Sequence, residues 1–383
     1  MRPLAALLAL VGVASAATAT TLAVRTSVGV TAVGPESRHP GPDSARVATL
    51  FATLSSADPT TCEMVADQIG NFWWSDGDAG VGQFSDVRRS ARAAKDSVSG
   101  PVRDPAAILL LTASLGTEDP CLRLVAAKLL GNSMVSDGDL TRLLESSQPR
   151  IREATLRAAG ERDRLALRDR VERMLADAPA VAAMAAWALG EWEQQGSVPA
   201  LRRSLAHEAA AVRAASAWAL GAIEDPAAAE ALEARAASDA DRGVRLAAIR
   251  ALGSIELARS APTLARVLDG GDVGLAIAAA EALQSLDGIE IAPDALVRAV
   301  DSPNADLRKA ALQALLGFEE ARLAPVFLRF IDDPDRDVRV RVIQSLGSMH
   351  ATQAVRAITR ALDDQDPEVR RAAVDALAEI DDR

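Results

Sequence analysis

A short motif recurs along most of this 383-residue chain and restricts the possible folds more than any other feature. The motif is Asp-Pro-x-Val-Arg followed by a helix of mainly small residues that ends in Ala-Leu-Gly, and its clearest copies, which vary from it at a few positions, lie at 335–347 and 366–377. The residue after the Val or Leu of each copy serves as an anchor. Nine anchors follow one another at intervals of 29 to 32 residues: Arg123, Arg152, Ala182, Arg213, Arg245, Ala276, Arg308, Arg339 and Arg370. A period of this length is typical of proteins built from stacked units, so nine repeats fill residues 105–383.

Each copy predicts the start of a second helix in its unit. A short polar residue stands four positions before six of the anchors and predicts an N-cap: Asp119, Asp241, Asp272, Asn304, Asp335 and Asp366. Prolines at the first helical position agree, namely Pro120, Pro149, Pro179 and Pro367. Eight positions before each anchor lies a mostly apolar ladder that predicts the buried face of a first helix: Leu115, Leu144, Met174, Leu205, Ala237, Leu268, Val300, Ile331 and Leu362.

Composition agrees with an all-α protein. Hydrophobic residues make up 49% of the chain, which excludes disorder, while aromatic residues make up 3% and tyrosine is absent. The formal charge of -11 opposes binding to a phosphate backbone, so nucleic acid is not an expected partner.

These units resemble HEAT repeats, of the short kind also found in phycobilisome lyase subunits, over about three quarters of the chain. The resemblance implies a right-handed α-solenoid of nine to ten two-helix repeats, with the second helices lining its concave face. It also implies a ladder of Asp–Arg pairs between repeats. That ladder should be interrupted at Ala182 and Ala276, where the anchor is not arginine.

The N-terminal segment predicts export. An apolar run from Leu4 to Val13 precedes Ala14-Ser15-Ala16, which has the small residues of a signal-peptidase site, so residues 1–16 are expected to be a signal peptide. The mature protein would then be periplasmic or secreted, with no membrane insertion. The alternative is an anchor formed by an uncleaved N-terminal segment. Residues 17–45 contain several prolines and little apolar content and predict a flexible linker.

Residues 46–104 predict a degenerate cap repeat with an insertion at 71–100. Cys62 falls at the anchor position of this tenth unit, and Trp73, Trp74 and Phe84 lie in the insertion. We expect the aromatic residues to cover the open end of the core, the alternative being a binding role. Cys62 and Cys121 both stand at the start of the second helix in consecutive units, so export favours a disulfide between them over two buried thiols.

The sequence carries no recognisable catalytic signature. Its three histidines are scattered, and no phosphate loop or nucleophile elbow is present. Neither a metal nor a cofactor is expected, and the chain is interpreted as a non-enzyme.

The concave face is the expected partner site. Five positions past the anchors, a stripe of side chains should point away from the first helices, and it includes Arg157, Trp187, Trp218, Arg250 and Glu281. We predict that these residues, with Trp192, bind a protein or peptide, because Trp and Arg dominate interface energetics. The alternative is that the indoles pack as additional core. The predicted function is a monomeric scaffold or adaptor; the alternative is an accessory subunit of an enzyme or a cofactor-attaching, lyase-like protein.

Overall fold

A computed structural model describes residues 41–55, 62, 65–66, 101–286, 288 and 293–381. The predicted signal peptide, most of the predicted linker, and Trp73, Trp74 and Phe84 lie outside the described residues. The first described helix, α1 (Ser44–Leu54), is capped by Asp43, which accepts from the Arg46 amide. Among the described residues, helical structure therefore begins just inside the range predicted as linker.

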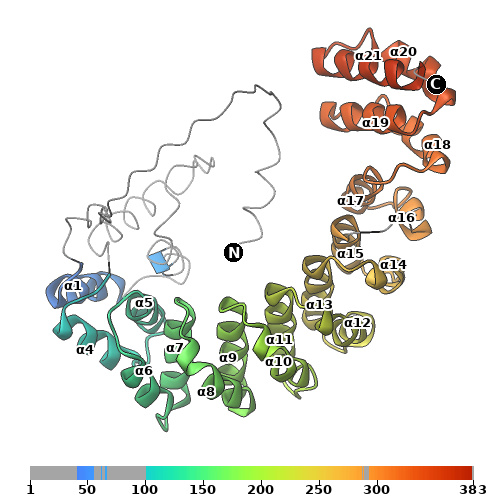
Figure 1. Ribbon diagram of the computed structural model, residues 1–383. Coiled ribbons are helices and arrows are strands. Elements are labelled where there is room, and N and C mark those ends of the chain that lie inside the picture. The colour runs from blue at the N-terminus through green and yellow to red at the C-terminus, as the bar shows by residue number, and fades with distance from the viewer. Residues whose placement is uncertain are drawn as a thin grey trace, which may run out of the picture. The chain divides into compact units, whose positions relative to one another are not determined.

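Nine helix pairs follow one another between Pro105 and Asp381 of the described residues (Figure 1). The first helices are α4 (Pro105–Ser114), α6 (Asp137–Leu144), α8 (Arg168–Arg173), α10 (Val198–Ser204), α12 (Ala229–Ser238), α14 (Ala261–Leu268), α16 (Asp294–Ala299), α18 (Ala324–Phe327) and α20 (Val355–Ala361). The second helices are α5 (Pro120–Gly131), α7 (Pro149–Gly160), α9 (Pro179–Glu191), α11 (Ala210–Ile223), α13 (Arg242–Ile255), α15 (Val273–Ser285), α17 (Ala305–Leu315), α19 (Arg336–Ser348) and α21 (Pro367–Asp381).

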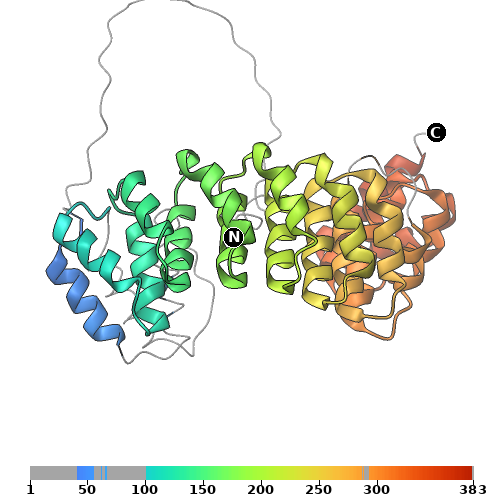
Figure 2. The same ribbon diagram turned by 90° about the horizontal axis from the view of Figure 1, so that it is seen from below.

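The two kinds of helix form two rows. Each second helix packs on its own first helix and, from α5 to α17 and again from α19 to α21, on the next second helix along the chain. In Figure 1 the second helices lie along one side of the array and the first helices along the other. Helices of neighbouring repeats run roughly parallel to one another (Figure 2). None of the helices in the described ranges is both long and apolar enough to cross a membrane.

The predicted caps are confirmed. Asp119 accepts from the amides of Cys121 and Leu122, and Asp241 accepts from that of Val244. The other four predicted residues, Asp272, Asn304, Asp335 and Asp366, likewise accept an amide two or three positions ahead. These side chains satisfy amides that have no partner within the helix, which fixes where each second helix begins.

The predicted apolar ladder of the first helices is buried at seven of its nine positions. Leu362 is half-buried, and Ala237 is exposed while its neighbour Ala236 is fully buried. The prediction for Ala237 was wrong because in this repeat the buried residue, Ala236, lies nine positions before the anchor Arg245 instead of eight. The second helices contribute fully buried alanines and leucines, and the two rows share one continuous core.

Candidate functional site

The second helices carry a row of accessible side chains on the side away from the first helices. We define the second-helix face as the residues one and five positions past each anchor. None of the five-position residues is buried, and they are Lys128, Arg157, Trp187, Trp218, Arg250, Glu281, Gln313, Gln344 and Asp375. The one-position residues, from Leu124 to Arg371, are likewise half-buried or exposed. Spacing four residues apart on a helix places both rows on one surface.

Trp187 on α9 is half-buried and leans back on the preceding second helix. The tip of its indole lies so close to Gly160, at the end of α7, that a Cβ there would come within 2.4 Å of the ring. The Arg157 guanidinium lies over the ring, 5.8 Å from its centroid, in a cation–π arrangement. Ala183, one turn earlier on α9, is too small to cover this indole, but Arg157 and Gly160 cover much of it.

Trp218 on α11 is the more accessible indole, with 38% of its surface exposed. It contacts the preceding repeat at Gly190, where an added Cβ would lie 2.7 Å from the ring. Its neighbours on the second-helix face, Ala214 on α11 and Leu246 on α13, are half-buried. Trp218 is therefore a large apolar side chain that is held against the preceding repeat and leaves 38% of its surface open to solvent.

Trp192 does not belong to this surface. It is 2% exposed, and its indole nitrogen donates to the carbonyl oxygens of Ala159 at 3.2 Å and Arg162 at 2.9 Å. The ring thus binds the end of α7 to the end of α9 as part of the core. Its inclusion among the partner-binding residues was wrong because Trp192 stands at the helix C-cap, where the side chain turns inward.

The polar residues of the predicted stripe are separate from one another. Arg250 on α13 and Glu281 on α15 are both exposed, and no ion pair joins either side chain to a described residue. Beyond them, Gln313 accepts from Arg341 at 2.8 Å, and Asp375 lies 3.9 Å from Arg371. The structure thus brings Arg157 and Trp187 together and places Trp218 and Arg250 on successive neighbouring helices.

A ladder of Arg–Asp pairs holds successive repeats in register behind this face. Arg152, Arg213 and Arg339 each pair through two hydrogen bonds with an aspartate 25 or 26 residues ahead. Ala182 and Ala276 are buried and contribute no rung. The interruptions predicted at Ala182 and Ala276 are therefore confirmed. Among the described residues, the ladder is also interrupted where it was not predicted to be, at Arg123, Arg245 and Arg308, which donate to backbone carbonyls of their own repeats instead of to an aspartate of the next.

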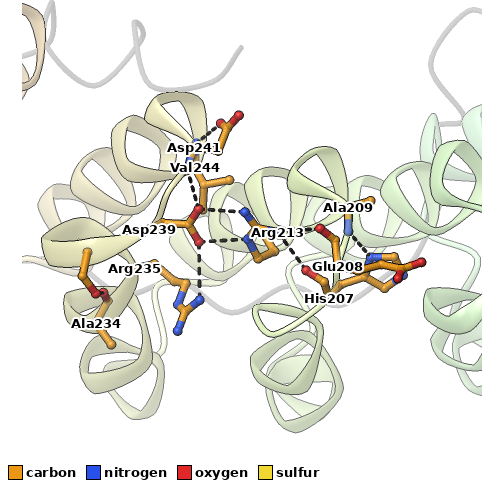
Figure 3. Close-up of polar contacts among 10 residues, drawn as sticks. His207, Glu208, Ala209, Arg213, Ala234, Arg235, Asp239, Asp241 and Val244 are labelled. Carbon is orange, nitrogen blue, oxygen red and sulfur yellow. Dashed lines mark hydrogen bonds and ion pairs between the residues drawn. The ribbon is translucent and has the colours of Figure 1, made fainter.

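The rung at α11 is the most enclosed of the three. Figure 3 shows its polar contacts. Both Asp239 oxygens accept from Arg213 at 2.8 Å, a third bond comes from Arg235 at 3.4 Å, and the Asp241 amide donates at 2.9 Å. The Asp239 side chain is only 1% exposed. Hydrogen bonds from Arg213 lower the pKa of Asp239, although burial acts in the opposite direction.

Arg213 also binds the loop that precedes its own helix. Its Nη1 donates to the carbonyl oxygens of His207 and Glu208, both at 2.9 Å (Figure 3). His207 itself accepts from the Ala209 amide through Nδ1. The ladder therefore fixes the start of α11, the helix that carries Trp218.

Cys62 and Cys121 form a disulfide, with their Cα atoms 5.6 Å apart. This confirms the pairing predicted from their places at the start of the second helix in consecutive units. Cys121 follows Pro120 at the start of α5, so the bond joins the predicted cap repeat to the first complete repeat. Within the ranges that the structure describes, no group of three or more His, Cys, Asp or Glu side chains could hold a metal ion.

The described helices define an α-solenoid of sequentially packed helix pairs. A family model for HEAT repeats matches residues 167–253, 234–316 and 324–383, more than half of the chain. The protein therefore belongs to the HEAT-repeat family. No curated protein matches the sequence.

Several solved structures resemble the chain at the level of the fold. An engineered protein is 19% identical, with a TM-score of 0.49 over 88% of this chain and 98% of that chain. The complex of CpcE and CpcF of phycocyanin lyase from Nostoc is 20% identical, with a TM-score of 0.38 over 64% of this chain and 95% of that chain. Importin beta is 13% identical, with a TM-score of 0.48 over 87% of this chain and 53% of that chain.

Proposed function

We propose that the protein is a non-enzymatic scaffold that binds a protein or peptide partner on its second-helix face, centred on Trp218 and Trp187. The observation that carries this proposal is the state of Trp218. A tryptophan that is 38% exposed beside half-buried Ala214 and Leu246 leaves apolar surface in contact with water. Binding of a partner that covered this surface would be favoured, because it would remove from water the apolar surface that remains exposed after folding.

The local environment suits a binding hot spot. Trp and Arg are the side chains that most often dominate interface energetics, especially where they are held rigidly before binding. Trp218 is seated on Gly190, and Arg157 is held over Trp187. Trp218 and Arg157 therefore lose little side-chain conformational freedom when a partner binds. The accessory-subunit and lyase-like alternative has no comparable observation in its favour among the described residues.

We also propose that the protein works in an oxidising compartment, as the N-terminal sequence predicts. The Cys62–Cys121 disulfide supports this location, because such bonds persist in exported proteins and are rare in the reducing cytosol. Fractionation of cells that produce the full chain with a C-terminal tag tests the proposal. Export predicts tagged protein in the periplasmic or secreted fraction, and recovery from the cytosol alone would contradict it.

Replacing Trp218 with alanine is expected to weaken partner binding by about 2 kcal/mol or more, because a rigid aromatic anchor would be removed. The matched control is Leu165→Ala, which truncates another exposed apolar side chain, in the short 3-10 helix (Leu165–Leu167) between α7 and α8 and outside the second-helix face. Partners would be captured on wild type and both variants, quantified by mass spectrometry, and the affinity of the captured protein then measured by calorimetry. A partner lost from Trp218→Ala and kept by Leu165→Ala, at unchanged helicity, is the expected result. Retention by both variants would contradict the proposal.

A further inference from the structure

The central part of the second-helix face has a charge opposite to that of the chain. Trp187, Trp218 and half-buried Leu246 lie between two arginines, Arg157 on α7 and Arg250 on α13. The protein as a whole carries a formal charge of -11. From net charge alone, a basic partner would be expected.

The two arginines are available to a ligand. Neither Arg157 nor Arg250 forms an ion pair with any residue in the described ranges. Glu153 precedes Arg157 by one turn without pairing with it, and the next carboxylate on the face beyond Arg250 is Glu281 on α15. This differs from the ladder behind the face, where Arg152, Arg213 and Arg339 are each neutralised by an aspartate.

We propose that the partner segment seated on this face carries apolar side chains flanked on both sides by carboxylates. The inference rests on the proposed function and specifies the chemistry of its partner. A guanidinium at the edge of an apolar surface binds a carboxylate through paired, charge-assisted hydrogen bonds, which are strengthened where water is excluded. The apolar side chains of the segment would cover Trp218 and Leu246, while its acidic residues would meet Arg157 and Arg250.

The repeat geometry sets the length of the segment. Three steps between packed second helices, α7 to α9, α9 to α11 and α11 to α13, separate Arg157 from Arg250. At roughly 8–10 Å a step, this path is about 24–30 Å long. An extended peptide, which rises about 3.3 Å per residue, covers that distance with about eight residues. The acidic groups should therefore be about eight residues apart.

Two synthetic fluorescein-labelled peptides test the inference by fluorescence anisotropy. One is Asp-Asp-Leu-Phe-Gly-Ser-Phe-Leu-Asp-Asp, and the other has lysine in place of every aspartate. The acidic peptide should bind wild type at least about tenfold more tightly than the basic one, since like charges oppose association. Arg250→Glu should weaken the acidic peptide and strengthen the basic one. Trp218→Ala should weaken both, and the control Arg356→Glu, an exposed site on α20, should change neither.

The outcomes separate this inference from the proposed function. Equal affinity for the two peptides, no effect of Arg250→Glu, or no binding of either peptide would overturn the inference. If partner capture still depends on Trp218 in any of these cases, the proposed function stands and only the acidic partner is rejected. Partner capture that is independent of Trp218 would instead reject the proposed function. Circular dichroism of each variant checks that the helices are intact.

Discussion

Reduction of the Cys62–Cys121 disulfide is expected to lower the stability of the N-terminal repeats by about 4 kcal/mol. The bond joins residues 59 positions apart, and opening so long a loop restores conformational freedom to the unfolded chain. Both cysteines are buried, so the reduced side chains remain in the core. The loss of stability therefore comes mainly from removing the cross-link that restrains the unfolded chain. The cap repeat should therefore unfold before the rest of the array.

Urea unfolding with and without reductant measures this effect, and hydrogen exchange locates it. Protection should fall in α4 and α5 and be largely kept in α19 and α21, because repeat arrays transmit stability chiefly between neighbours. The control is the Cys62→Ala, Cys121→Ala double variant, which should not respond to reductant. Two reactive thiols in denaturant without reductant, or unfolding curves that coincide, would refute the disulfide's role.

Asp239→Asn is expected to destabilise the protein by about 3 kcal/mol, the cost of removing one partner from a buried ion pair. Asp239 accepts hydrogen bonds from Arg213, Arg235 and the Asp241 amide while its side chain is almost fully enclosed. An amide cannot accept all of these bonds, and its NH2 group would face a guanidinium. Asp269→Asn is the matched control, since Asp269 also pairs with an arginine, Arg298, but both side chains are exposed. That pair is screened by solvent, so the control should show a much smaller loss.

The same rung predicts an acid sensitivity of defined sign. The pKa of Asp239 is lower in the folded protein than its ordinary 3.8, principally because Arg213 donates hydrogen bonds to it. The contribution of Asp239 to the free energy of unfolding is therefore fully present above the pKa that this residue has in the unfolded chain. It is lost as the pH falls through the lower pKa of the folded protein. Thermal unfolding from pH 6 downwards should show a steeper loss below about pH 4 in wild type than in Asp239→Asn. Parallel curves would contradict the assignment.

Local rules predicted most of the fold because each element is specified by residues close to it in sequence. An aspartate or asparagine before a helix satisfies amides within three residues, so Asp119 and Asn304 could be identified as caps from spacing alone. The interruptions of the Arg–Asp ladder at Ala182 and Ala276 could likewise be predicted, because the sequence has alanine in place of arginine at these two anchors. Sequence spacing was less reliable where the buried residue shifts by one position relative to the anchor, as at Ala237.

The candidate site depended on contacts between repeats, which one repeat's sequence does not specify. Periodicity placed Trp187 and Trp218 on the second-helix face, and the structure agrees. It did not show that Gly160 and Gly190 provide the space into which the indoles fit, although these are the terminal glycines of the preceding repeats. These glycines could have been found in the sequence, because Gly160 lies 27 residues before Trp187 and Gly190 lies 28 residues before Trp218. Trp192 was misplaced because its position at a helix end leaves the direction of the side chain open.

The most direct test of partner binding on the second-helix face is site-specific photocrosslinking at two positions of one repeat. Ser254 is exposed on α13, one turn past Arg250, and Ala234 is exposed on α12, in the first-helix row of that repeat. Each would be replaced by p-benzoylphenylalanine, and the proteins irradiated with the captured partner. A partner seated on the second-helix face should be crosslinked from position 254 and not from position 234. Crosslinking at 234 alone, or equally at both, would contradict partner binding on this face.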